Sequence, residues 1–363
     1  MWRLIAVCAT WGVFWGSWSV LLPTIKDQIG ATTADLGFAL AGVPVGAIAA
    51  MALVGKLAAG RERTMLALST CAFALSILLI PTARSPLVLG LFLLLLGATS
   101  GALDVTLNMA TGRAERETGR RLFQPVHAAF PVAVIVTAPL TGLARELGLG
   151  PAILLGVIAL LLLTTGLLVL GLPLSKGVPD TERGGVRLPW LGALSVGLLA
   201  ACVLIIENSV EQWSVLLLEE YRDASTLLAS AAPTAYMGAL TVGRLLAQAF
   251  PRVNLRALYL ISAFGGGGGI ALAGLGPSAW ISLTGFAVAG LALGPIFPAM
   301  LSRAATSGGA MVVAFSTISY TGFVISPLLV AVLSFWFGLP LAIALLGLLA
   351  LPLLGHLLST RSP

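Results

Sequence analysis

The chain has 363 residues, of which 58% are hydrophobic and only 9% are charged, and its mean hydropathy is +1.03. A soluble core cannot bury so much apolar surface, so the composition excludes an ordinary soluble protein and indicates a chain that lies mostly in lipid. The formal charge is +6, but the basic residues are scattered over short loops, which argues against a nucleic-acid partner. The three cysteines are far apart and form no CxxC motif, so we expect neither a disulfide framework nor a metal or cofactor site.

Apolar stretches long enough to cross a bilayer follow one another along the chain. The first starts at the N-terminus without a cleavage site, so it is predicted to be a membrane span and not a signal peptide. The predicted spans lie at about 3–23, 35–58, 64–82, 86–110, 123–145, 150–173, 190–217, 226–250, 255–275, 280–303, 310–336 and 339–358. We therefore predict an all-α integral membrane fold of twelve transmembrane helices, with a six-helix bundle at 1–173, a cytoplasmic linker at 174–189 and a second six-helix bundle at 190–363.

The lysines and arginines predict the orientation of these spans. With the N-terminus inside, sixteen of the 20 basic residues fall on the cytoplasmic side and four on the other. Cytoplasmic loops carry such an excess of Lys and Arg. Both termini are therefore predicted to be cytoplasmic.

Four short motifs occur in both halves of the chain, in the same order. The offset between matching motifs is 188 to 193 residues. The pairs are VGKLAAGR (54–61) with VGRLLAQAFPR (242–252), GATSG (97–101) with GLALG (290–294), APL (138–140) with SPL (326–328), and GLGP (148–151) with FGLP (337–340). A parallel repeat of two such bundles indicates a transporter in which the halves rock around a site at the bilayer midplane.

Three segments resemble the major facilitator superfamily, specifically its fucose-permease-like bacterial branch. They are GSWSVLLPTIKDQIG (16–30) in the first span, Asp104 followed four residues later by Asn108, and Glu207 followed by Trp213 and Gly243–Arg244. The resemblance implies a monomeric secondary transporter in the bacterial inner membrane, which moves a small-molecule solute by alternating access and is coupled to H⁺.

The chain also departs from this pattern. Ala59 stands where the loop between spans two and three of the superfamily carries an Asp, and the first span has no acid, unlike sugar symporters of the branch. APLTG (138–142) resembles a fifth-span signature of superfamily antiporters, with Ala138 in place of its first Gly. Uptake of a sugar-like solute and efflux of a drug or metabolite both stay open.

Asp104 is the candidate proton-coupling residue. It lies nine residues before Arg113 at the predicted cytoplasmic edge, which is roughly 13 Å of helix and places it near the midplane. A carboxylate at that depth costs at least about 2.5–3.5 kcal/mol unless it faces a cavity or a partner. Burial disfavours its charged form, so it can exchange a proton near neutral pH. An Asp–Asn pair that only ties span four to a neighbouring helix is the alternative.

Five further residues are candidate substrate-binding groups. Asn108 lies one turn from Asp104 on the same face, where its amide can bond to the acid or to a substrate hydroxyl. His127 and Gln124 share a face at the start of span five, where a histidine can relay protons or simply lie at the interface. Trp15 is the mid-depth member of the stripe Trp11, Trp15 and Trp18, which either stacks on substrate or packs as core. Glu207, counted from Trp190, falls in the outer leaflet, either facing the vestibule or pairing with Arg145.

Basic residues at the cytoplasmic helix ends are candidate gating groups. Ion pairs between helices at Lys56, Arg61, Arg63 and Arg244 could hold one access state, and Lys56 and Arg244 recur at equivalent repeat positions. The alternative is that these residues reflect only the positive-inside bias.

Two other functions are weighed against transport. A membrane-embedded enzyme needs a nucleophile, a metal cluster or a close acid–base pair, whereas this chain has two histidines and no HExxH motif. A sensor derived from a transporter needs a soluble domain to pass a signal on, and no loop is long enough to form one. We therefore predict that the chain is not an enzyme.

Overall fold

The computed structural model describes residues 2–174, 190–250 and 255–359. The chain divides into two compact units, an N-terminal unit of Met1–Glu182 and a C-terminal unit of Arg183–Pro363. The linker predicted at 174–189 lies, apart from Leu174, outside the described residues.

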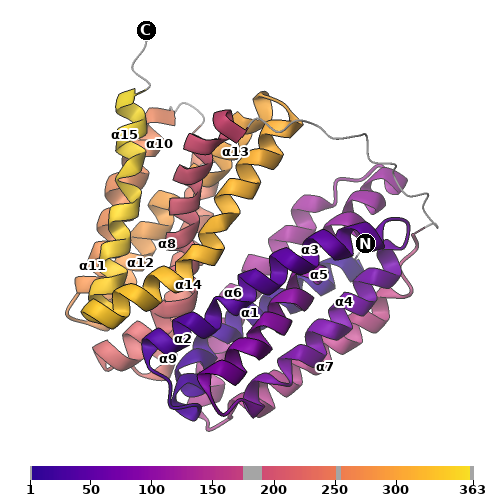
Figure 1. Ribbon diagram of the computed structural model, residues 1–363, viewed down its shortest axis with the longest axis horizontal. Helices are drawn as coiled ribbons and strands as arrows, with labels where there is room; N and C mark the ends of the chain where they lie inside the picture. Colours follow the sequence, from indigo (N-terminus) through magenta and orange to yellow (C-terminus); the bar gives the residue numbers. More distant parts are fainter. Residues whose placement is uncertain (1, 175–189, 251–254, 360–363) are drawn as a thin grey trace. The chain divides into compact units, whose positions relative to one another are not determined.

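The N-terminal unit is a bundle of long helices that lie side by side (Figure 1). Its elements are α1 (Trp2–Gln28), α2 (Thr33–Leu40), α3 (Gly42–Ala58), α4 (Glu62–Ile77), η1 (Ile80–Thr82), α5 (Pro86–Thr118), α6 (Phe123–Glu146) and α7 (Pro151–Val169). Within this unit α1 packs on α6, α3 on α5, and α4 on both α5 and α7.

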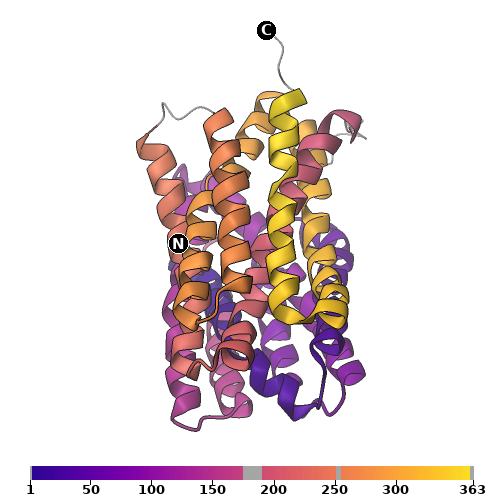
Figure 2. The ribbon, with the colours of Figure 1, turned by 90° about the vertical axis from the view of Figure 1, so that its left-hand side faces the viewer.

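The C-terminal unit is built in the same way, and its long helices also lie side by side in both views (Figures 1 and 2). Its elements are α8 (Trp190–Arg222), α9 (Thr226–Ala249), α10 (Leu255–Ile261), the π-helical turn η2 (Ser262–Gly266), α11 (Gly267–Leu275), α12 (Ala279–Leu293), α13 (Ile296–Thr306), α14 (Gly309–Leu346), η3 (Gly347–Ala350) and α15 (Pro352–Ser359). Here α8 packs on α14, α9 on α12, and α11 on α12 and α14. The helix pairs therefore correspond to those of the N-terminal unit.

The described residues hold ten helical segments that are long and apolar enough to cross a membrane. They do not include the 24-residue helix α9, whose serine, threonines, tyrosine and arginine lower its hydropathy. The last of the ten, Met311–Gly355, contains two predicted spans, because the backbone of α14 leaves the helical conformation at Gly338 (φ 76°, ψ 158°). Counted this way, the described part of the chain contains each of the twelve predicted helices.

Several predicted spans are interrupted. The span predicted at 35–58 breaks at Ala41 into α2 and α3. The span predicted at 280–303 breaks between α12 and α13 at Gly294–Pro295, where the proline has no main-chain N–H for helical hydrogen bonding. The glycine run 265–269 covers the end of the five-residue π-helical turn η2 and the start of α11. Because glycine has no side chain, this run leaves room for a wider helical turn against a neighbouring helix.

Two of the repeated motifs perform the same packing task in the two units. A Cβ atom at Gly97 of α5 would lie 1.9 Å from the carbonyl oxygen of Val43 in α3, and one at Gly290 of α12 would lie 2.3 Å from that of Tyr236 in α9. The two glycines and the two residues they contact are each 193 residues apart. The GATSG and GLALG motifs thus let equivalent helix pairs approach backbone to backbone.

Candidate functional site

The middle of α5 carries the half-buried carboxyl group of Asp104, the nineteenth of 33 helical residues. The amide Nδ2 of Asn108 donates to Asp104 Oδ1 at 2.8 Å and to its main-chain oxygen at 3.0 Å. Asn108 Oδ1 lies 2.9 Å from Nε2 of the exposed His127 in α6. An amide oxygen only accepts, so His127 donates here, and it keeps this bond in its neutral and protonated forms. The three side chains form one hydrogen-bonded chain, and of the two partners that the sequence allows for the Asn108 amide the structure shows Asp104.

Helix α1 contributes two residues near these three side chains, Trp11 of the predicted tryptophan stripe and Cys8. The indole nitrogen of Trp11 donates to Ser100 Oγ at 3.0 Å, one turn before Asp104 on α5. The Trp11 ring also meets Phe130 of α6 edge-on at 5.1 Å. Cys8 is completely buried and close enough to interact electrostatically with Asp104. The spacing of residues 100, 104 and 108 was a usable signal for Ser100, whereas the approach of α1 depends on tertiary packing.

Among the described residues, two of the predicted substrate-binding residues form no hydrogen bond with Asp104, Asn108 or His127. Trp15 is half-buried and meets Phe14 edge-on at 5.1 Å, while Trp18 is fully buried and stacks on Phe14 at 5.8 Å. The exposed side chain of Gln124 makes no hydrogen bond among the described residues. The tryptophan stripe therefore contributes to helix packing at Trp18 and to a hydrogen bond at Trp11.

In the C-terminal unit the structure brings together Glu207 and Arg244, which the sequence assigned to different tasks. Glu207 is the eighteenth of the 33 residues of α8, near its middle, because the helix extends to Arg222 and not to 217 as predicted. Arg244 of α9 interacts electrostatically with Glu207 and with Glu211, one turn further along α8. Its Nε donates to the carbonyl oxygen of Gly294 at 3.1 Å. Arg145, the alternative partner, donates to the carbonyl oxygen of Val20 at 2.7 Å.

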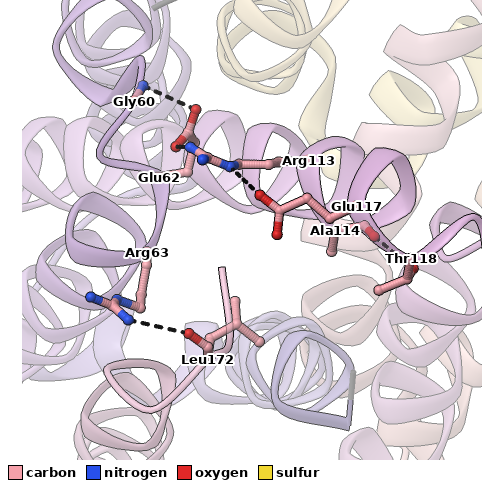
Figure 3. A network of polar contacts seen from close by, with 8 residues as sticks. All are labelled: Gly60, Glu62, Arg63, Arg113, Ala114, Glu117, Thr118 and Leu172. Carbon is pink, nitrogen blue, oxygen red and sulfur yellow. Dashed lines mark hydrogen bonds and ion pairs between the residues drawn. The ribbon is translucent and has the colours of Figure 1, made fainter. Parts of the chain in front are cut away.

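Arg113, which the sequence places at the cytoplasmic edge, is part of a network of ion pairs. Helix α5 continues to Thr118 and includes Arg113. Arg113 is buried, with 7% of its surface exposed. Its Nη1 lies 2.6 Å from Glu62 Oε2 of α4, and its Nε lies 2.9 Å from Glu117 (Figure 3). Glu62 also accepts from the main-chain nitrogen of Gly60 at 3.0 Å. A buried, doubly paired arginine thus ties the loop before α4 to the end of α5.

The predicted gating residues of the N-terminal unit do not make these contacts. Lys56 and Arg61 are exposed and form no ion pair among the described residues. Arg63 donates to the carbonyl oxygen of Leu172, beyond α7, at 3.4 Å (Figure 3). An ion pair between helices does form at this end of the unit, between Glu62 and Arg113. The sequence did not predict it because both residues lie in segments of mixed charge.

Nearby, Glu115 connects the end of α5 to the start of α6. Its Oε1 accepts from the main-chain nitrogens of Leu122 and Phe123, the residues at which α6 begins. His127 stacks flat on Phe123, with ring centroids 6.0 Å apart. The side chain of Glu115 in α5 therefore helps to fix the start of α6, which carries His127.

Among the described residues, no group of three or more His, Cys, Asp and Glu side chains is placed to hold a metal ion.

Comparison with known proteins decides the family. Residues 3–310 match the protein-family model described as Major Facilitator Superfamily. The chain belongs to the Major Facilitator Superfamily. Its fold matches the crystal structure of a mutant of the nucleoside transporter NupG with a TM-score of 0.83, at 13% identity and over 99% of each chain. It also matches a bacterial homologue of the lysosomal transporter Spinster, in an inward-facing and occupied conformation, with a TM-score of 0.74 at 13% identity, over 99% of this chain and 96% of that one.

Similar sequences come from bacteria. An uncharacterised MFS-type transporter of Yersinia pestis is 26% identical over 94% of this chain and 90% of its own length. The membrane protein MosC of Rhizobium meliloti is 24% identical over 87% of this chain and 79% of its own length. This superfamily member is thus a multi-pass secondary transporter, and the predicted twelve-helix membrane fold is confirmed. The membrane-enzyme alternative is excluded by the family.

Proposed function

We propose that this transporter moves a small polar solute by alternating access and couples the movement to protons through Asp104. A deprotonated carboxylate resists closure of an occluded site because the charge loses its water. A proton taken from water on one side neutralises Asp104 and lowers the free energy of the occluded state. Release of that proton to water on the other side restores the charge and completes the cycle.

The observation that carries this proposal is the hydrogen-bonded chain from Asp104 through Asn108 to His127. A half-buried carboxyl group near the middle of a membrane helix is functional by default. The Nδ2–H of Asn108 stabilises the charged form, while the exposed imidazole of His127 lies at the other end of the chain. This arrangement supplies polar groups between mid-helix and solvent, which proton exchange requires. A purely structural Asp–Asn pair does not need the exposed histidine.

For the solute, we propose a compound rich in hydroxyl groups, as the resemblance to the fucose-permease-like branch implies. The amide of Asn108 can bond to such groups, and Trp15, Gln124 and Glu207 stay proposed contacts. The related fold of a nucleoside transporter places nucleosides among the compounds to be tested. Efflux of a drug or metabolite is kept as the second candidate because Pro139 lies inside α6 within the APLTG segment.

We also propose that the transporter is a monomer in the bacterial inner membrane with both termini in the cytoplasm. The sixteen-to-four distribution of Lys and Arg supports this orientation. At the cytoplasmic end, the buried Glu62–Arg113 ion pair, which Glu117 extends, is better suited than the exposed Lys56 and Arg61 to hold the ends of α4 and α5 in one arrangement. Arg63 and Arg244 remain proposed gating residues.

The test is flux into liposomes that contain the purified full-length protein, with a pH gradient imposed in either direction. Radiolabelled hexoses and nucleosides are screened together with cationic dyes. We expect at least one compound to accumulate only when the gradient is present. Asp104→Asn is expected to lose this accumulation and fall to the level of empty liposomes, while the protein stays monodisperse in detergent.

The matched control is Asp27→Asn, which makes the same chemical change at an exposed position near the end of α1. This variant is expected to accumulate solute like the wild type. Gradient-driven accumulation by Asp104→Asn at the wild-type level would remove Asp104 from the mechanism.

A further inference from the structure

The centre of α8 carries a pair of acidic residues, separate from Asp104. Glu207 and Glu211 are four residues apart, so they project from one face of the helix, one turn from each other. Both residues are half-buried. They interact electrostatically with each other as well as with Arg244. Two carboxyl groups therefore share one environment near the middle of a membrane helix.

Helix α9 packs on α8 and contributes the two other members of this cluster. Tyr236 and Arg244 are eight residues apart, about two turns on the same face of α9. Tyr236 is completely buried, and its hydroxyl has no hydrogen-bond partner among the described residues, yet it interacts electrostatically with both acids and with the arginine. A buried hydroxyl without a hydrogen-bond partner costs free energy. An unpaired hydroxyl that interacts with two carboxyl groups therefore indicates a functional site.

Among the described residues of the C-terminal unit, the other elements that pack on α8 add no buried cation to this cluster. These elements are α14, α12, η3 and α13. Their titratable residues are Tyr320 of α14 and Arg303 of α13, and both are exposed. In the part of the chain that the structure describes, Arg244 is therefore the cation with which both Glu207 and Glu211 interact.

The charges of this cluster do not balance when both acids are ionised. Among the described residues, two carboxylates then interact with one guanidinium, which leaves one uncompensated negative charge at a half-buried position of a membrane helix. Such a charge is costly, and two close carboxyl groups resist simultaneous ionisation. We propose that Glu207 and Glu211 share one dissociable proton, which makes the pair a second proton-binding site of this transporter, in the C-terminal unit.

The chemistry of this site is a simple exchange with water. A proton from water forms an O–H bond with one carboxylate of the pair, and the other carboxylate stays ionised against Arg244. On release the proton returns to water and the pair carries two negative charges, for which the Tyr236 hydroxyl is the available additional donor. The protonation belongs to the pair and not to one of its members. This proposal goes beyond the coupling role of Asp104 and does not depend on it.

The experiment is infrared difference spectroscopy of the purified full-length protein in lipid nanodiscs while the pH is raised. A protonated carboxylic acid gives a carbonyl-stretch band that disappears on deprotonation. In the wild type, two such bands are expected to disappear as the pH is raised, one from Asp104 and one from the pair. The Asp104→Asn variant is expected to lack the Asp104 band and to keep the band of the pair. The Glu207→Gln and Glu211→Gln variants are each expected to lack the band of the pair completely, because the remaining carboxylate is then balanced by Arg244.

The control on the same helix is Glu220→Gln, at an exposed position, which is expected to keep both bands. Loss of the same band in either single variant is the signature of a shared proton, and a purely structural acid would not produce it. The proposal is overturned if the band survives in both single variants. It is equally overturned if Asp104→Asn removes every protonated-carboxyl band, a result that would leave the Asp104 mechanism standing.

Discussion

The packing of α5 against α3 depends on the missing side chain of Gly97. A Cβ atom there would lie 1.9 Å from the carbonyl oxygen of Val43 and 2.7 Å from its Cα. Carbon–oxygen contacts between packed helices are about 3.3 Å or longer, so Gly97→Ala requires the helices to separate by about 1.4 Å at this level. The obstructing atoms belong to the backbone and cannot rotate away.

The size of the effect follows from two opposing contributions. Alanine favours the helix interior over glycine by about 0.5–1 kcal/mol. Overpacking costs about 1–3 kcal/mol, and the rigid neighbour in this case indicates the upper part of that range. Gly97→Ala is therefore expected to lower the free energy of unfolding by about 1–2 kcal/mol. Thermal unfolding of the purified protein in detergent, followed by tryptophan fluorescence, should give a clearly lower midpoint.

The matched control is Gly90→Ala in the same helix, where a Cβ would lie at an ordinary 3.5 Å from Ala39 Cα. This variant is expected to unfold at or above the wild-type temperature. Gly290→Ala, the equivalent change in the C-terminal unit, is expected to destabilise as Gly97→Ala does. If Gly97→Ala is as stable as Gly90→Ala, the explanation of the repeated motifs by close backbone packing is refuted.

Two other substitutions test polar contacts between helices by the same thermal assay. Glu62→Gln removes the charge opposite the buried Arg113, and we expect a loss of about 1.5–3 kcal/mol because Glu117 remains as a partner; an unchanged midpoint would show that the pair does not stabilise the fold. Ser209→Ala removes the buried 2.8 Å hydrogen bond to Ser326, with an expected loss of about 0.5–1.5 kcal/mol. A loss as large as that of Glu62→Gln would contradict this assignment.

Most of the fold could be predicted because lipid imposes strong rules on sequence. Apolar length gives each span, and Gly–Pro at 294–295 gives a kink. The break at Ala41 and the π-helical turn at Ser262–Gly266 could not be predicted, because each depends on how a neighbouring helix packs. The extension of α5 to Thr118 was missed for a related reason. Charged residues beyond the hydrocarbon edge look like a loop, although the helix continues through them.

The candidate site was only partly predictable. Asp104 and Asn108 lie on one helix, so their spacing alone predicts their contact. The approach of His127 and Trp11 requires the packing of α6 and α1 on α5, which no local pattern encodes. The assignment of Arg244 to a separate gate came from its place near the end of a span, whereas its partners lie on the antiparallel helix α8. Depth counted along one helix does not predict which side chains meet across two.

The most direct test of the central claim is whether protons cross the membrane with the solute. Liposomes that contain the protein and a trapped pH-sensitive dye are given a solute gradient with no initial pH difference. The proposed mechanism predicts a dye response in the wild type. For Asp104→Asn it predicts exchange of labelled solute with no dye response. An equal proton movement in both proteins would contradict the claim that Asp104 carries the coupled proton.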